Sequence, residues 1–315
     1  MIEGVDGKGR FVNSLSCFKA VLLAVLAALL GPCGPEVARA EAAAAAPVKP
    51  GEATCDRAAF RVIVDVGHTL QVPGAKSARG LTEYEFNLAL AKQVEQSLID
   101  AGFGKTTLLV TDGRSMQGLA RRVTQTNNSS ADLFLSIHHD SVPDRFLEKW
   151  EFEGKERGFS DRFKGHSIFV SIDNGDFKGS LRFGRLLGQQ LKDRGLQYTR
   201  HYTDKIMGHR QRQLVDADVG VYRYDQLIVL KSTHMPAVLL EAGSIINRDE
   251  ELAMGTPERR SLISAAATDA VERFCSSRRS RNSPQVAHRP GVAPAPKVNR
   301  QPHAAIPPAR PDTPR

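Results

Sequence analysis

The stretch LFLSIHHD, residues 133–140, joins a short apolar run directly to three polar side chains. An apolar run of this length predicts a buried strand, and strands buried on both faces are typical of parallel sheets. In open sheets of this kind, ligands bind beyond the carboxyl ends of the strands. We therefore expect His138, His139 and Asp140 to lie at the functional edge of a sheet.

Further short apolar runs lie on either side of this stretch and alternate with segments whose apolar residues recur at helical spacing. The runs that predict the sheet are residues 60–65, 108–111, 133–137, 167–172, 227–230 and 237–240. Helices are predicted at residues 83–101, 116–126, 180–191 and 257–274. The alternation predicts a single α/β domain with a mainly parallel twisted sheet of about six strands and helices on both faces.

Ligand-type side chains follow several of these runs. His68 follows the first strand, His138 the third and Glu241 the last, while Glu83 begins the first helix. Each alone has a simpler interpretation, as a hydrogen-bonding loop histidine or a carboxylate at a helix N-terminus. Together, two histidines and one glutamate with a position left open form a catalytic zinc set, and a nearby carboxylate can act as general base. The residues by themselves thus indicate a zinc amide hydrolase.

Four segments resemble the signature blocks of the zinc-dependent N-acetylmuramoyl-L-alanine amidase family, the type 3 cell-wall amidases. They read VIVDVGHT, TEYEFNLALA, LFLSIHHDS and MPAVLLEAGSIINRDEE, in the family's order. The resemblance implies one Zn²⁺ bound by His68, Glu83 and His138, with Glu241 as the catalytic carboxylate. It also implies hydrolysis of the amide bond between N-acetylmuramic acid and L-alanine in peptidoglycan, for cell-wall remodelling and daughter-cell separation.

One other glutamate is an alternative metal ligand, and several polar residues are weaker candidates for the site. Glu85 competes with Glu83 as the ligand, although Asn87 matches an Asn of the family block and favours Glu83. The weaker candidates are polar residues that could orient a ligand or contact the substrate. They are His139 and Asp140 beside His138, Arg79 in the glycine-rich loop, and Lys231, which falls where the family often has an Arg.

Residues 142–165 form a connection longer than the sheet requires, and it contains the only tryptophan, Trp150. One interpretation is a loop near the active site that contacts the substrate. The other is an autoinhibitory element that offers a carboxylate, Glu148, Glu151 or Glu153, to the metal. We adopt the first, and the second stays open.

The two ends of the chain differ from its middle. Residues 1–40 carry a basic flank, an eleven-residue apolar run and a small-residue site at Ala40, which predict a secretory signal peptide. Residues 41–54 read as an Ala/Pro linker, and residues 276–315 as a disordered, Pro-rich basic tail. The catalytic domain is then residues 55–275. An exported protein of this kind is expected in the periplasm, where Cys55 and Cys275 would pair as a disulfide.

The net charge of +8 is concentrated in that tail, which holds eight Lys/Arg and one Asp. The domain itself is close to neutral, which excludes a uniformly basic nucleic-acid-binding domain. The family resemblance implies as partners the stem peptide and glycan of peptidoglycan, and an activator protein. The tail is suited to an anionic wall or membrane surface.

Two other functions fit parts of the sequence. A zinc carboxypeptidase-like peptidoglycan peptidase could use the same metal set. A non-catalytic cell-wall-binding regulator could have the same fold. Such a protein would not need the four motifs, which are all intact in this chain.

Overall fold

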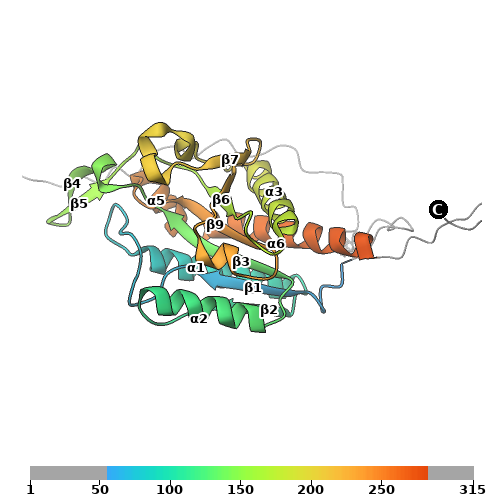
Figure 1. The fold of residues 1–315 in the computed structure, drawn as a ribbon. Coiled ribbons are helices and arrows are strands. Elements are labelled where there is room, and N and C mark those ends of the chain that lie inside the picture. Colours follow the sequence, from blue (N-terminus) through green and yellow to red (C-terminus); the bar gives the residue numbers. More distant parts are fainter. Residues whose placement is uncertain (1–54, 283–315) are drawn as a thin grey trace, which may run out of the picture. The chain divides into compact units, whose positions relative to one another are not determined.

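The computed structural model describes residues 55–282, and a seven-stranded sheet lies at the centre of this part of the chain (Figure 1). Its order is β2-β1-β3-β9-β6-β8-β7. The strands are β1 (Arg61–Val66), β2 (Lys105–Leu109), β3 (Leu133–Asp140), β6 (Ser167–Val170), β7 (Gln213–Asp216), β8 (Val221–Arg223) and β9 (Ala237–Ser244). The β1–β2, β1–β3, β3–β9 and β6–β8 pairs are parallel, while β6–β9 and β7–β8 are antiparallel. The predicted α/β domain with a mainly parallel sheet is confirmed.

Helices cover both faces of this sheet, as expected. They are α1 (Glu83–Asp100), α2 (Ser115–Asn128), α3 (Phe177–Asp193), α4 (Ile228–Lys231), α5 (Arg248–Gly255) and α6 (Pro257–Asn282). Apolar residues of α1, α3 and α6 pack on one face, and those of α2 and α4 on the other. Alternate strand residues serve the two cores: Val62 and Val64 face the first, and Ile63 faces the second.

One predicted strand of the sheet, at residues 227–230, was wrong. Residues 227–230 lie in and just before the short helix α4, where Val229 and Leu230 pack on the sheet. A four-residue apolar run cannot distinguish a strand from one buried helical turn. The sheet is instead extended by β7 and β8, which are too short and too polar in sequence to be recognised.

Residues 142–165 are ordered rather than a simple loop. They contain the 3₁₀ turn η1 (Asp144–Phe146) and a separate hairpin of β4 (Glu148–Phe152) and β5 (Lys155–Phe159). Glu153 and Gly154 both have positive φ, as a two-residue hairpin turn requires. The hairpin is fastened to the loop before α1, because the indole nitrogen of Trp150 donates to the carbonyl of Ala78 at 3.0 Å.

The C-terminal helix runs further than the sequence predicted. Helix α6 continues to Asn282, so residues 276–282 are helical and do not begin the tail. Arg278 on this extension donates to the carbonyl of Asp132, which anchors it to the domain. Cys275 forms the expected disulfide with Cys55.

The other predictions for the chain ends lie outside the described residues. These are the signal peptide (1–40), the linker (41–54) and the tail beyond residue 282. Within residues 55–282, no helix combines the length and apolar character needed to cross a membrane.

Candidate metal centre and catalytic pocket

The parallel strands end at one edge of the sheet and deliver the predicted site residues there. His68 lies two residues beyond β1, and His138 lies near the end of β3. The register of β3 with β9 places His138 directly beside Glu241. Glu83 is the first residue of α1, at the helix end nearest this edge. The structure thus brings together the four residues that the sequence singled out for metal binding and catalysis.

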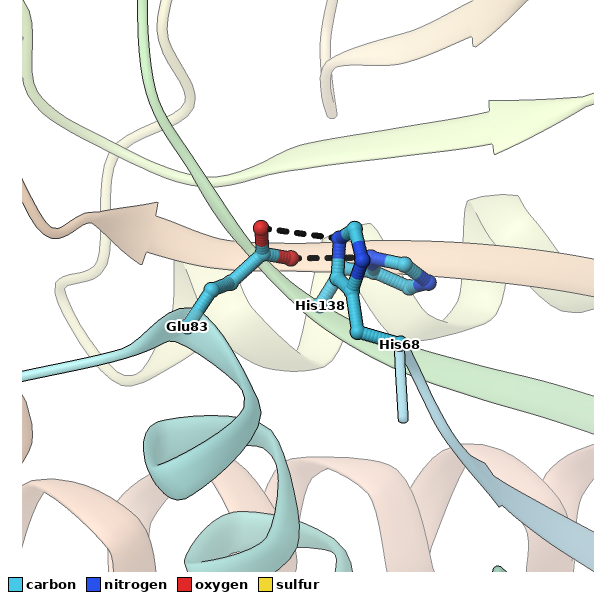
Figure 2. A group of neighbouring side chains, drawn as sticks. All are labelled: His68, Glu83 and His138. Atoms are coloured by element: carbon cyan, nitrogen blue, oxygen red, sulfur yellow. Dashed lines mark hydrogen bonds and ion pairs between the residues drawn. The ribbon is translucent and has the colours of Figure 1, made fainter. Parts of the chain in front are cut away.

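Glu83 contacts both histidines at once (Figure 2). Its Oε2 lies 2.9 Å from Nε2 of His68, and its Oε1 lies 2.9 Å from Nδ1 of His138. One ligand atom from each of the three side chains falls within 4.8 Å of the other two. Burial alone would raise the pKa of Glu83, but hydrogen bonds from His138 and His68 outweigh it and hold that pKa well below its usual range. Two nitrogens and one ionised carboxylate oxygen therefore converge on one point.

Two glycines allow the three side chains to approach one another. A Cβ atom on Gly67 would lie 2.3 Å from the imidazole of His138. A Cβ atom on Gly74 would lie 2.4 Å from Oε2 of Glu83, and Gly74 has a φ of +78° as well. Larger residues at either position would push a ligand side chain away.

The backbone at His68 is held in an unusual conformation. His68 has a φ of +65°, a region that residues other than glycine seldom occupy. The guanidinium of Arg122, on α2, donates to the carbonyls of His68 (2.7 Å) and Val66 (3.1 Å). The same group lies 3.0 Å from the buried carboxylate of Asp65. Arg122 therefore fixes the turn that presents His68.

A series of buried hydrogen bonds through Asn87 holds the carboxylate of Glu83. The amide of Asn87 donates to Glu83 Oε1 (3.3 Å) and to the carbonyl of Gly67 (3.1 Å). Its oxygen lies 2.8 Å from Nδ1 of His139, and burial lowers the pKa of His139 to about 3. The side chain of His139 thus contacts Asn87 rather than His138, and its backbone nitrogen donates to Glu83 Oε1 at 3.4 Å.

Glu85 has a different task. Its carboxylate accepts hydrogen bonds from the backbone nitrogen and hydroxyl of Thr82, both at 2.7 Å, in a capping box that starts α1. These hydrogen bonds lower the pKa of Glu85. The side chain is exposed and takes no part in the group formed by Glu83 and the two histidines.

The three ligand-type residues open into a pocket of about 450 Å³ that also contains Glu241. Oε2 of Glu241 is buried and has no hydrogen-bond partner among the described residues. Burial, followed by the charges of Asp140 and Glu83, raises the pKa of Glu241 well above its usual value. Such a carboxyl group can accept a proton and hold it.

The remaining candidates divide between the pocket and other places. Asp140 lines the pocket and accepts a 2.7 Å hydrogen bond from the hydroxyl of Tyr202. Arg79 does not line it: its guanidinium donates to Glu251 and lies over the ring of Trp150. Lys231 is exposed at the end of α4 and does not line the pocket either. A substrate-binding role for these two cations is therefore not supported.

The sequence did not single out Arg210 or Arg212, the two arginines that line the pocket. Arg210 lies there beside Asp140 and donates to the carbonyl of Ser141 at 2.9 Å. It belongs to the 3₁₀ segment η3 (Lys205–Arg210), which follows η2 (His201–Thr203). No apolar period or strand end marks this region in the sequence, so only its folding across the sheet edge reveals it.

Comparisons with known proteins agree with this geometry. The family model described as N-acetylmuramoyl-L-alanine amidase matches residues 62–273. The chain is 25% identical to N-acetylmuramoyl-L-alanine amidase AmiA of Escherichia coli over an alignment of 236 positions, which covers 67% of this chain and 74% of that protein. It is 22% identical to N-acetylmuramoyl-L-alanine amidase AmiC of Neisseria meningitidis, over 68% of this chain and 52% of that protein. In fold it is similar to the N-acetylmuramyl-L-alanine amidase Ami1 of Mycobacterium smegmatis, with a TM-score of 0.53, 17% identity, and coverage of 70% of this chain and 98% of that one.

Proposed function

Because this chain belongs to the N-acetylmuramoyl-L-alanine amidase family, we propose that it is a zinc hydrolase of peptidoglycan. It cleaves the amide bond between N-acetylmuramic acid and the L-alanine of the stem peptide. The observation that carries this proposal is the shared pocket. In it, the carboxylate of Glu83 contacts two histidines and lies near Glu241, whose Oε2 has no hydrogen-bond partner in the described part of the chain.

The donor set fits zinc. His68, Glu83 and His138 offer two imidazole nitrogens and one carboxylate oxygen, the ligand types and number of a catalytic zinc site with one open position. Zinc bound there would act as a Lewis acid that polarises the scissile carbonyl. Asn87 would keep Glu83 oriented, and Arg122 would do the same for His68.

Glu241 is the proposed proton carrier. Its Oε2 takes a proton from the attacking water and delivers it to the nitrogen of the leaving amine, so that the carboxyl group serves first as base and then as acid. The buried negative surroundings, to which Asp140 contributes, favour the protonated form between these two transfers. Tyr202 and Arg210 hold Asp140 in place on the other side of the pocket.

The proposed function is tested with Glu241→Gln, which keeps the size of the side chain and removes the base. We expect the variant to retain zinc while turnover of purified peptidoglycan falls by about 100-fold or more. Metal analysis and mass spectrometry of the released fragments provide the readouts. Glu83→Ala is the companion variant and should lose both zinc and turnover.

The same assay separates the alternatives. Unchanged turnover in Glu241→Gln would contradict the proposal. Cleavage between two amino acids of the stem would identify a carboxypeptidase-like peptidase instead. A wild-type protein that binds peptidoglycan and releases no fragments would indicate a non-catalytic regulator.

We further propose that the enzyme is exported to the periplasm by residues 1–40 and serves cell-wall remodelling and daughter-cell separation. The linker at 41–54 and the basic tail would flank the catalytic domain, with the tail held near anionic wall or membrane groups. An activator protein is a further proposed partner.

A further inference from the structure

A second cavity, of about 650 Å³, lies outside the catalytic pocket. Its walls are the segment before β6, the loop between α3 and η2, and the first turns of α5 and α6. Four cationic side chains line it, against two carboxylates. The cations are Arg162, Lys164, Arg200 and Arg259, and the carboxylates are Asp204 and Glu250. The cavity therefore carries an excess of positive charge.

The two carboxylates already have partners within the protein. Oε2 of Glu250 accepts hydrogen bonds from the backbone nitrogens of Gly165 (2.8 Å) and Ser244 (2.9 Å). Oδ1 of Asp204 accepts from the nitrogen of Ile206, and its other oxygen lies 3.8 Å from Arg162. Across residues 55–282, no direct ion pair involves Lys164, Arg200 or Arg259, although burial raises the pKa of Glu250 and the charges of Arg259 and Lys164 act to lower it.

A buried histidine in the wall has unsatisfied hydrogen-bonding capacity. His166 is 3% exposed, and its ring nitrogens make no well-formed hydrogen bond among the described residues, although burial lowers its pKa and the nearby backbone of Gln197 acts to raise it. Its backbone is clamped to the α3–η2 loop, because its nitrogen donates to Gln197 and its carbonyl accepts from Thr199. A Cβ on Gly165 would lie 2.7 Å from the Gln197 carbonyl, so the two segments are in close contact. The two segments that form this wall are therefore packed firmly against each other.

This cavity adjoins the catalytic pocket through a short polar contact. His201 lines the cavity, and its Nε2 lies 3.4 Å from Oδ2 of Asp140, which lines the catalytic pocket. Consecutive residues of β9 also serve the two sites, since Glu241 faces the catalytic pocket and Ala242 lines the cavity. The two sites thus lie on opposite faces of the sheet at one edge, with the buried His201–Asp140 contact between them, and a substrate that occupies both must pass around this edge.

We propose that this cavity binds a carboxylate of the peptide part of the substrate and anchors it away from the scissile bond. The inference rests on the proposed amidase function, which supplies a peptide rich in carboxylates. Guanidinium and ammonium groups bind carboxylates through charge-assisted hydrogen bonds, and His166 adds a further buried partner. A membrane surface fits less well, because none of the large, exposed apolar side chains of the domain lines the cavity.

The test is a calorimetric titration of the full chain with the free stem peptide, which lacks the scissile amide and is not turned over. Lys164→Ala/Arg259→Ala removes two cations of the cavity, and both side chains are partly or fully exposed, so the fold should persist. Lys92→Ala/Arg121→Ala removes two exposed cations elsewhere and is the matched control. We expect roughly tenfold weaker binding in the first variant and wild-type binding in the control.

Two further measurements locate the bound group. The stem peptide with its carboxylates converted to carboxamides should bind wild type about as weakly as the unmodified peptide binds the cavity variant. Nitrogen NMR of His166 should shift when the unmodified peptide is added to wild type. Equal peptide affinity in wild type and the cavity variant would overturn the proposal.

A membrane site would give a different result. In that case the cavity variant would lose adsorption to phosphatidylglycerol vesicles while its peptide affinity stayed at the wild-type value, and this outcome also overturns the proposal. Peptidoglycan turnover is measured on the same preparations. An inactive wild type would count against the amidase function. If wild type is active but its peptide affinity does not change when Lys164 and Arg259 are replaced, the result would count against the carboxylate anchor alone.

Discussion

At the scale of single residues, the metal set depends on close approach as much as on ligand identity. Gly67→Ala adds one methyl group that would lie 2.3 Å from the His138 ring. We expect it to displace His138 and to weaken zinc affinity by about tenfold or more, a loss typical of changes around metal ligands. Competition titration with a chelator measures this.

The matched control is Gly104→Ala, where an added Cβ meets nothing within 4 Å. Its zinc affinity should equal that of wild type. Equal affinity in Gly67→Ala and Gly104→Ala would show that the close approach of Gly67 to His138 has no effect on the site.

The choice between two nearby carboxylates is also a matter of single residues. Glu85→Ala should retain zinc and lose about 1 kcal/mol of unfolding free energy, because its carboxylate serves the helix cap with Thr82. Glu83→Ala should lose the metal. Metal analysis and chemical denaturation of both variants test this, and the reverse pattern of metal loss would make Glu85 the ligand.

His166 is expected to make the fold sensitive to acid. Burial is the main cause that lowers the pKa of His166 to about 4, from about 6.5 in the unfolded chain. The backbone of Gln197 acts against this shift, and the charge of Arg259 adds to it. Between these values the unfolded state binds more protons, so stability is full above pH 6.5 and is lost as the pH falls toward 4. The loss is on the order of 3 kcal/mol for this group.

His166→Phe should remove that share of the acid sensitivity while keeping a buried ring of similar size. Denaturation midpoints across this pH range measure the effect. Lys164 and Glu250 also lie nearby, so Arg259→Ala serves as a comparison that leaves the imidazole in place. An unchanged pH profile in His166→Phe would contradict the assignment.

At the scale of elements, the β4–β5 hairpin behaves as a brace for the loop that carries Gly74. Trp150 is fastened to the carbonyl of Ala78, and the guanidinium of Arg157 packs where a Cβ on Gly80 would lie. Trp150→Ala should cost about 2 kcal/mol of stability and lower peptidoglycan turnover, because the loop beside Glu83 loses its support. Thermal unfolding and turnover assays measure both.

The glutamates of the hairpin test whether it inhibits the enzyme by offering a carboxylate to the metal. Glu148, Glu151 and Glu153 are all exposed and do not join the metal group. Changing all three to Gln should leave turnover within about twofold of wild type, because exposed charges interact weakly with their surroundings. A rise of several-fold would revive the autoinhibitory interpretation.

Elements also differ in how well the sequence predicts them. Helix α1 was predicted within one residue, because its capping box and apolar spacing are local signals. Strand β2 was placed about three residues late, since its bounds follow its pairing with β1 and not its own apolar residues. The run at 227–230 was assigned to the wrong type because four apolar residues fit a buried turn as well as a strand.

At the scale of the whole molecule, the Cys55–Cys275 disulfide joins the two ends of the described domain across 220 residues. Cys55 precedes β1, whereas His68 follows the other end of that strand. Cys55→Ser/Cys275→Ser should therefore lower the unfolding free energy by up to about 5 kcal/mol, the value for closing a loop of this length. Zinc content and turnover at low temperature should be unchanged.

Thermal unfolding with parallel turnover assays measures this prediction. Wild type treated with a thiol-blocking reagent is the control, since it keeps the disulfide. Loss of zinc in the double variant at temperatures far below its melting point would show that the disulfide supports the site directly.

The sequence by itself indicated most of the strands and helices around the site and predicted that His68, Glu83, His138 and Glu241 lie together at one edge of the sheet. These residues are recognisable because each lies at the end of an apolar run or the start of a helix, and parallel strands must end at one edge. Only the tertiary structure decided which other groups share their pocket. It placed Arg210 and Tyr202 there, left Arg79 and Lys231 elsewhere, and gathered the cations around His166. Such contacts join residues far apart in the chain, and their partners follow from packing across the sheet, which no local pattern records.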